Sequence, residues 1–377
     1  MFDVVIVGAG PVGLYLATLL LQEGLSVRIL EQRTEPSPHS RAIGIHPPAL
    51  AALERAGVAQ AMLAEGVHIS LGSALSGGRE VARLSFAAAC KQWPFVLTLK
   101  QARTEAILEE RVRALDPDAV VRGFCVTSVH DAGSVLTLSG SHGEHIQGRL
   151  AVGADGAHSA VRMLLGIPTS GRNYPDTYLM GDFPDTGSAG STALLYLEPG
   201  GIVESFPLPG GLRRWVLHTD SLLDQASPGD LAALIAERAG VSVDAEANSM
   251  LSAFGVRSRM ARRMVQGRTA LVGDAAHEIS PIGGQGMNLG WLDAAALAPI
   301  IVDALAGKAT GKRLARFERR RMRAARAASR QAWLNMALGR PLPASFLHLR
   351  HTGLRLVFRL NALRNLVARR FTMTHLR

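Results

Sequence analysis

The sequence is poor in cysteine and contains no long uncharged apolar run. Cys90 and Cys125 are the two cysteines among 377 residues, so neither a disulfide framework nor a cysteine metal site is expected, and a reducing cytoplasm is the natural setting. The apolar stretch 294–306 is interrupted by Pro299 and Asp303 and is shorter than the roughly 18–20 residues needed to cross a bilayer. No basic segment precedes an apolar one at the start, which argues against a signal peptide. We therefore expect a cytoplasmic protein without a membrane span.

Patterns typical of metal and nucleic-acid binding are missing as well. No histidine pair or carboxylate cluster has metal-ligand spacing. Residues 307–377 hold 18 Lys or Arg and a single acid, Glu318, within a net charge of +10. This basic C-terminus carries no aromatic stacking module, so no nucleic-acid partner is expected. We interpret it as a solvated helix face or as a weak contact with an acidic membrane surface, which would make the protein peripheral.

What the sequence does contain is alternation of strands and helices. Phe2–Val7 is rich in β-branched residues, Leu14–Gln22 is apolar on all sides, and Ser26–Leu30 returns as a strand, which predicts a βαβ unit of a parallel sheet. Further on, three alternating segments are separated by two Pro-Gly-Gly turns, at 199–201 and 209–211. Such a pattern predicts an antiparallel meander with one covered and one exposed face.

The fold class is therefore α/β: a discontinuous Rossmann-like dinucleotide-binding domain, an inserted antiparallel-sheet domain for the substrate, and a helical C-terminus. We assign residues 1–69, 97–173 and 255–310 to the first domain. The sheet domain takes 70–96 and 174–254, and the C-terminal helices take 311–377.

A glycine-rich turn between the first strand and helix carries the strongest local signal. Its sequence is Gly8-Ala9-Gly10-Pro11-Val12-Gly13. The first glycine permits the turn, the second admits a pyrophosphate close to backbone N–H groups, and the third allows close packing of helix and strand. Glu31 ends the second strand, where a carboxylate can accept hydrogen bonds from an adenosine ribose, and Gln32 and Arg33 follow it. The turn predicts dinucleotide binding.

Two later segments decide which dinucleotide is expected. One is Gly153-Ala154-Asp155-Gly156-Ala157-His158, and the other is Gly273-Asp274-Ala275-Ala276-His277, which continues through Pro281-Ile282-Gly283-Gly284-Gln285-Gly286-Met287-Asn288. Together with the N-terminal turn, and in this order, they resemble the three motifs of the class A flavoprotein aromatic monooxygenases, the group of para-hydroxybenzoate hydroxylase.

That resemblance implies FAD as cofactor, NADPH or NADH as co-substrate, and O2. In the family, O2 adds to reduced flavin at C4a, and the hydroperoxyflavin hydroxylates an aromatic, phenolic or polycyclic molecule. Two alternatives stay open. One is a ubiquinone-type ring hydroxylase acting on a quinone-like substrate at the membrane surface, which leucines interleaved with arginines over 347–366 would favour. The other is a flavin-binding accessory protein without monooxygenase turnover.

The resemblance also implies roles for particular residues. Arg41, His46 and Pro281 would lie at the flavin and act in catalysis, with a plain surface position as the alternative for Arg41. Asp155 would contact the pyrophosphate and support NAD(P)H use, with a helix-capping role as its alternative. His277 is interpreted as structural. The implied cofactor-binding residues are Gly8, Gly10, Pro11, Val12, Gly13, Glu31, Gln32, Arg33, Arg41, Gln101, Asp155, Gly156, Gly273, Asp274, Pro281, Gly284, Gly286, Met287 and Asn288.

Substrate contacts are expected from the predicted sheet. Candidates there are its large or polar aromatic side chains, with core packing as the alternative for each of them. They are Tyr178, Tyr196, Phe206, Trp215 and His218.

Overall fold

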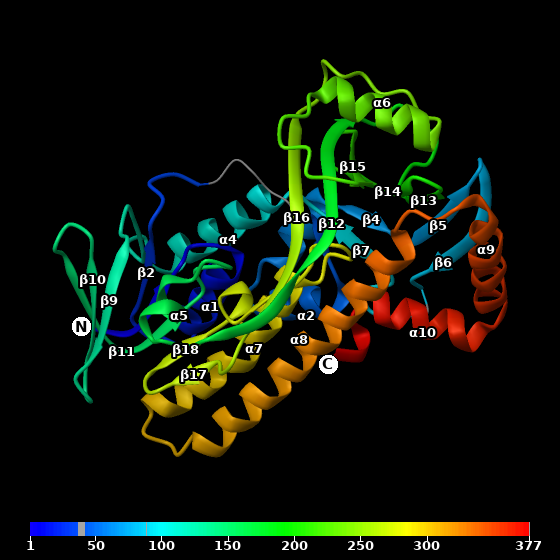
Figure 1. Cartoon of the computed structure of the whole chain (residues 1–377). Helices are drawn as coiled ribbons and strands as arrows, with labels where there is room; N and C mark the ends of the chain where they lie inside the picture. Colours follow the sequence, from blue (N-terminus) through cyan, green and yellow to red (C-terminus); the bar gives the residue numbers. More distant parts are fainter. Residues whose placement is uncertain (37–41, 88, 377) are drawn as a thin grey trace.

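The computed structural model describes residues 1–36, 42–87 and 89–376 (Figure 1). Its first sheet has eight strands, with a parallel centre in which β1 (Phe2–Val7) lies between β2 (Val27–Glu31) and β11 (His145–Gly153). β8 (Val120–Arg122) and β18 (Thr269–Leu271) extend this centre in parallel. The hairpin β9 (Val126–Asp131) and β10 (Leu136–Gly140), and the short β17 (Val265–Gln266), complete the sheet. The predicted βαβ unit is confirmed.

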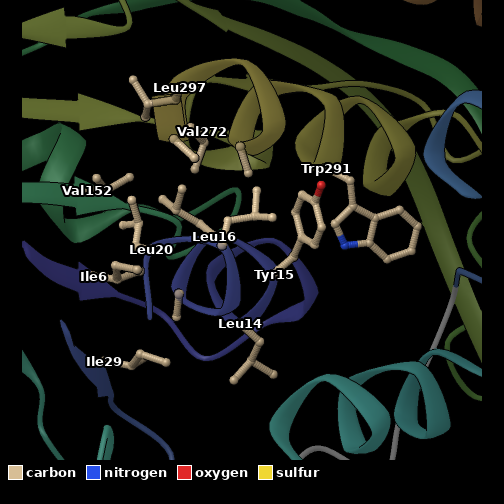
Figure 2. Packing of buried hydrophobic residues seen from close by; sticks show 14 of the residues in the cluster. Ile6, Leu14, Tyr15, Leu16, Leu20, Ile29, Val152, Val272, Trp291 and Leu297 are labelled. Carbon is tan, nitrogen blue, oxygen red and sulfur yellow. The ribbon is translucent and has the colours of Figure 1, made fainter. Parts of the chain in front are cut away.

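Helices pack on this sheet through a common apolar core. α1 (Pro11–Gln22) contacts α4 (Gln101–Leu115) and α7 (Gly286–Leu305). Figure 2 shows Tyr15 of α1 beside Trp291 of α7, whose indole N–H donates to the Pro11 carbonyl at 2.9 Å. α7 is long and apolar enough to cross a membrane by length and composition, but 56% of its most apolar window is buried in the protein. It packs as a core helix.

The second sheet also has eight strands, in the order β19-β16-β12-β15-β14-β13-β5-β6. The meander is confirmed as β13 (Ala193–Glu198), β14 (Gly201–Leu208) and β15 (Leu212–Thr219), all antiparallel. β5 (Leu71–Ser76) and β6 (Arg79–Ser85) join it as expected through the β13–β5 pair. β12 (Thr169–Pro184) and β16 (Met250–Ala261) run from this sheet toward the first domain (Figure 1), and β19 (His277–Glu278) pairs with β16.

The expectation of one exposed sheet face is wrong. α6 (Pro228–Ala239) covers that face, with Leu231 and Ile235 packed against Trp215. The sequence did carry a signal for this helix: Ser227 and Asp230 form a capping box, Pro228 begins the helix, and Gly240 ends it at φ 67°.

The smaller elements join the two sheets. β3 (Gly44–Ile45), β4 (Val67–Ile69) and β7 (Val96–Thr98) form a three-stranded sheet. α2 (Pro47–Arg55), α3 (Ala59–Glu65) and α5 (Ala160–Leu164) are short helices, and Gly273–Ala275 and Thr374–Leu376 are single 3₁₀ turns.

The C-terminal region is helical, as predicted. α8 (Gly311–Gly339) runs back along α7, and α9 (Ala344–Arg359) and α10 (Asn361–Phe371) fold beside β6 (Figure 1). Leucines on the outer side of α9 and α10 are exposed, whereas Ala368 is buried beside Phe86 and Ala193.

Candidate active site

A cavity of about 1170 Å³ extends from the carboxyl end of β1 to one face of the second sheet. Most of the residues proposed from the motifs line it, and Arg41 lies outside the described residues. The proposed residues in the cavity wall are Gly8, Gly10, Pro11, Val12, Glu31, Gln32, Arg33, His46, Gln101, Asp155, Gly156, Phe206, Asp274, Pro281, Gly284, Gly286 and Met287.

The glycine turn at one end of the cavity is sterically fixed. Gly8 has φ +106°, and a Cβ there would lie 2.5 Å from the Ala154 carbonyl oxygen. A Cβ on Gly13 would lie 2.0 Å from the Gly8 carbonyl oxygen, so helix and strand can meet only without it. A Cβ on Gly10, by contrast, would meet nothing within 4 Å. Gly10 therefore leaves open space beside the N-terminus of α1, which favours an anion.

Glu31 closes the edge of this turn. Its carboxylate accepts hydrogen bonds from the Ala9 amide at 2.8 Å and the Arg33 amide at 3.0 Å. Burial alone would raise the pKa of Glu31, but these bonds and the Arg33 guanidinium at 3.1 Å hold the pKa below its usual value. Glu31 is therefore a carboxylate at neutral pH, with unused lone pairs toward the cavity.

Asp155 holds the next turn and keeps one oxygen for a ligand. Its Oδ2 accepts from the Val161 amide at 3.1 Å, whereas Oδ1 is buried without a partner among the described residues. Burial raises the pKa of Asp155. Ser159 caps α5, because its hydroxyl accepts from the Arg162 amide at 3.0 Å. The orphaned oxygen at the cavity wall is the kind of acceptor that a bound ligand satisfies.

Asp274 projects into the cavity from its 3₁₀ turn. The side chain of Asp274 is accessible from the cavity but lies deep within the protein. Desolvation therefore raises the pKa of Asp274 to about 6, although the charge of His277 acts to lower it. The loop that follows needs glycine: Gly283 and Gly284 have φ +94° and +65°, which side chains rarely adopt. This loop leads into α7, whose N-terminal residues Gly286 and Met287 line the cavity.

His46 and Asn288 lock that loop in place. The His46 amide donates to Asn288 Oδ1 at 2.8 Å, and Asn288 Nδ2 donates to the carbonyls of Gly44 and Gly284 at 2.9 and 2.8 Å. Burial lowers the pKa of His46 to about 4, so its imidazole is neutral at physiological pH. Asn288 thus acts through its side chain, from behind the cavity wall.

His277 is part of a buried ionic group outside the cavity wall. Its Nε2 lies 2.5 Å from Asp293 Oδ2, and Arg321 Nε lies 2.6 Å from Asp293 Oδ1. Asp293 also accepts from the Gly273 amide at 3.1 Å. Desolvation lowers the pKa of His277, but Asp293 outweighs it and the net shift is upward. The group ties α7 and α8 to the turn that presents Asp274, which fits the structural interpretation of His277.

The five aromatic candidates from the second sheet divide between its two faces. Phe206 lines the cavity. Tyr178 and His218 share its face but are buried next to each other, with ring centroids 5.4 Å apart, and do not reach the cavity wall. Tyr196 and Trp215 are on the opposite face and pack under α6. For these two residues, core packing and not substrate contact describes their position.

Several cavity residues were not anticipated from the sequence. The inner sides of α9 and α10 contribute Leu354, Phe358, Val367 and Phe371, and Phe371 stacks on Phe86 with centroids 5.3 Å apart. Glu204 and Arg214 come from the sheet face. The i, i+4 pairs Leu354/Phe358 and Val367/Phe371 were a usable signal for inward helix faces. A single glutamate in a strand gave none.

Comparison with known proteins identifies the family. A family model described as "FAD binding domain" matches residues 1–332. The chain belongs to this FAD-binding family. The match includes the glycine turn, Asp155, Asp274 and the loop before α7, and it also includes the strands of the second sheet. The residues present also fit FAD, since Gly10 leaves room for phosphate, Asp155 keeps one oxygen without a described partner, and Asp274 lines the cavity.

Similar proteins in the family have names that describe oxygenation. The rifampicin monooxygenase of Streptomyces venezuelae is 32% identical over 309 residues, covering 78% of this chain and 62% of that protein. The 12-dehydrotetracycline 5-monooxygenase/anhydrotetracycline 6-monooxygenase of Streptomyces rimosus subsp. rimosus is 32% identical, covering 85% and 66%. The chain thus spans about two thirds or less of the length of the curated relatives it matches.

Solved structures show the same fold. The p-nitrophenol 4-monooxygenase PnpA of Pseudomonas putida superposes with a TM-score of 0.88 at 24% identity, covering 100% of this chain and 98% of that one. The Diels-Alderase PyrE3 from pyrroindomycin biosynthesis gives a TM-score of 0.83 at 26% identity, covering 99% and 80%. The α/β architecture with a dinucleotide-binding domain and an inserted sheet is therefore confirmed.

Proposed function

We propose that this protein is an FAD-dependent monooxygenase that uses NADPH or NADH and O2 to hydroxylate an aromatic or polycyclic small molecule. The observation that carries the proposal is one continuous cavity, which joins a dinucleotide cradle to a largely apolar sheet face. The names of the relatives point in the same direction.

The cofactor would lie along the residues that line the first end. Gly10 and the N-terminus of α1 would receive the pyrophosphate, and Glu31 the adenosine ribose. Asp274 would accept from ribitol hydroxyls, and the N-terminus of α7 at Gly286–Met287 would face the flavin pyrimidine edge, where reduction places negative charge. FAD, once bound, supplies hydride acceptance and O2 activation. Pro281 would lie over the ring, and the assignment of Arg41 stays a prediction from the resemblance.

The protein's own contribution is to position the ring and exclude water. Aliphatic side chains of the sheet, Ile282 of the loop and the aromatic rings of α9 and α10 close the second end. A covered, apolar site prevents the activated oxygen from being lost as peroxide. Asp155 is proposed to support the reduction of the flavin by NAD(P)H. Such a reaction also fits the proposed cytoplasmic location.

The test is turnover by the FAD-loaded protein. We expect yellow protein after reconstitution, NAD(P)H oxidation stimulated by phenols or polycyclic aromatics, and a product about 16 mass units heavier. Asp155→Ala should slow anaerobic reduction of the flavin by NAD(P)H more than it slows reoxidation by O2. Failure to retain FAD would refute the proposal.

A second candidate is a flavoprotein of this fold without oxygen transfer. The observation in its favour is the likeness to PyrE3, which is named as a Diels-Alderase and 80% of whose length this chain covers. If FAD binds tightly but no panel compound acquires oxygen, this candidate replaces the first. The surface-acting, ubiquinone-type alternative has one observation in its favour, the exposed leucines of α9 and α10. It requires the protein to co-sediment with anionic vesicles and to lose this on removal of 345–377.

A further inference from the structure

Glu204 is a lone carboxyl in the apolar half of the cavity. It lies in the middle of β14, its residue is 8% exposed, and it lines the cavity. Among residues 1–36, 42–87 and 89–376, no hydrogen bond or ion pair engages it, and burial is the sole cause that raises its pKa to about 7. A buried carboxyl without a protein partner is costly, and such groups persist at sites where a ligand satisfies them.

The strand register places Glu204 at the centre of one row across the sheet. Leu195 of β13 and Val216 of β15 are its direct neighbours. Beyond them the same row continues through β5 on one side and through β12 and β16 on the other. Glu204 is the one charged residue in this row. The residues of the row, all of which line the cavity, are Ala74, Leu195, Glu204, Val216, Met180 and Ser252. A ring lying on this row meets apolar surface over most of its area and a carboxyl at Glu204.

The row faces the loop that carries Pro281. Ile282 packs in one cluster with Val216 and Met180, the neighbours of Glu204 in the row. A planar molecule held between that loop and the sheet would therefore lie within reach of Glu204. This places the carboxyl within the substrate space, away from the glycine turn at the other end.

The nearby charged groups are already engaged. Arg214 makes a bidentate pair with Asp182, at 2.7 and 2.9 Å, and both are buried. Lys100 approaches the same Asp182 at 3.7 Å. On α9, Arg350 donates to the carbonyls of Leu338 and Leu197 through its two Nη atoms, whereas its Nε is buried without a described partner.

Beneath the cavity wall a second group is also internally paired. Arg340 donates to Asp176 through Nε and Nη2, each at 2.8 Å, and His218 lies 3.6 Å from the same carboxylate. The hydroxyl of Tyr178 is buried without a described partner, and its pKa is raised by burial and then by the charges of Glu204 and Asp176. None of the residues that the structure describes donates a hydrogen bond to the cavity side of Glu204, so a ligand in the cavity can supply one.

We propose that Glu204 is the specificity-determining residue of this cavity, accepting a hydrogen bond from an O–H group on the edge of the substrate ring. The inference rests on the proposed function for its setting, and it names the substrate class as hydroxylated rings rather than ring ethers or bare hydrocarbons. Accepting this bond orients the ring in a fixed direction against the Pro281 loop.

The test measures binding without turnover. FAD-loaded protein is titrated, without NAD(P)H, with 2-naphthol and with 2-methoxynaphthalene, and Kd is taken from the change in the flavin absorption spectrum. We expect the wild type to prefer the naphthol about tenfold, the effect of one hydrogen bond to a partly ionised acceptor. Glu204→Gln, whose amide oxygen still accepts, should keep a preference. Glu204→Leu should lose it.

The matched control is Glu198→Gln, at the end of β13, where the carboxylate accepts from the Gly77 amide away from the cavity wall. It should bind both ligands as the wild type does. Equal preference in wild type and Glu204→Leu, or no preference in the wild type, would overturn the role of Glu204. Loss of FAD binding or absence of an oxygenated product would instead contradict the proposed function. The naphthol titration measures neither of these, because it uses protein that is already loaded with FAD and involves no turnover.

Discussion

The two ends of the cavity are built by different means. At the dinucleotide end, backbone contacts set the shape: a Cβ on Gly13 would lie 2.0 Å from a carbonyl oxygen, and one on Gly8 2.5 Å from another. At the sheet end, side chains such as Glu204 and Val216 set the shape, on a regular strand register. The first end admits few substitutions, whereas the second can change its ligand by exchanging one side chain.

The largest effect should come from filling the space at Gly13. Gly13→Ala forces a methyl group against the Gly8 carbonyl, so we expect a loss of stability of about 3 kcal/mol or more and loss of FAD. Gly10→Ala is the control, since its Cβ meets nothing within 4 Å; it should unfold like the wild type yet bind FAD more weakly. Thermal unfolding and flavin content measure both. Equal stability of the two variants would mean that backbone contact does not define this end.

The next effect concerns the sheet end and depends on pH. Burial raises the pKa of Glu204 from its usual range to about 7, so the folded state holds its proton more tightly than the unfolded state does. Stability from this group is full at low pH and is lost as pH rises through about 7. Glu204→Gln removes that loss and should stabilise the protein above pH 8 by roughly 3 kcal/mol, with little change near pH 4.

Urea unfolding of both proteins at several pH values tests this expectation. Parallel pH profiles for wild type and Glu204→Gln would show that the carboxyl is already satisfied in the folded protein, and Glu204 would then have no need of a ligand.

The fold of the dinucleotide end could be predicted from the sequence because its constraints are local. A glycine turn, a strand-end acid and a helix start lie within one short segment, so their geometry follows from chain connectivity. The βαβ unit, the meander and the C-terminal helices were confirmed on the same basis. Arg41, which the resemblance assigns to the flavin, falls outside the described residues.

The sheet end was harder because its surface depends on pairing between distant strands. A shift of one residue in the strand register would exchange Trp215 and Arg214 between the two faces of the sheet. In addition, α6 covers the other face and thereby makes the aromatic residues there part of the core. Glu204 carries no motif. Its importance comes from the row that β5, β13, β15 and β12 build around it, which no local pattern reports.

A moderate effect at the cofactor end is expected from Asp274→Ala. Removing a carboxylate that faces the cavity deprives the ribitol hydroxyls of a charged acceptor, so FAD affinity should fall by roughly 1.5–3 kcal/mol, or about ten- to a hundredfold. Equilibrium dialysis of FAD measures it. Asp303→Ala, on the distant surface of α7, is the control and should retain wild-type affinity. Unchanged FAD affinity in Asp274→Ala would contradict the assignment of Asp274 as the acceptor for the ribitol hydroxyls.

The smallest effect should come from the helical wall. Phe371 stacks on Phe86 at 5.3 Å and meets the His46 ring at 6.0 Å. Phe371→Ala opens the sheet end to water, so we expect a few-fold rise in peroxide per NAD(P)H consumed, with FAD affinity unchanged. Leu366→Ala, on the exposed side of α10, serves as control. An equal rise in peroxide in both variants would mean that Phe371 does not exclude water from the sheet end.

The most direct test of the two-ended cavity is a crystal structure of the FAD-loaded protein with 2-naphthol. We expect the dinucleotide along Gly8–Gly13 and Asp274, and the naphthol between Pro281 and β14 with its hydroxyl on Glu204. A naphthol bound outside this cavity, or a cofactor that occupies the sheet end and leaves no room for a ring, would contradict the division of the cavity into a cofactor end and a substrate end.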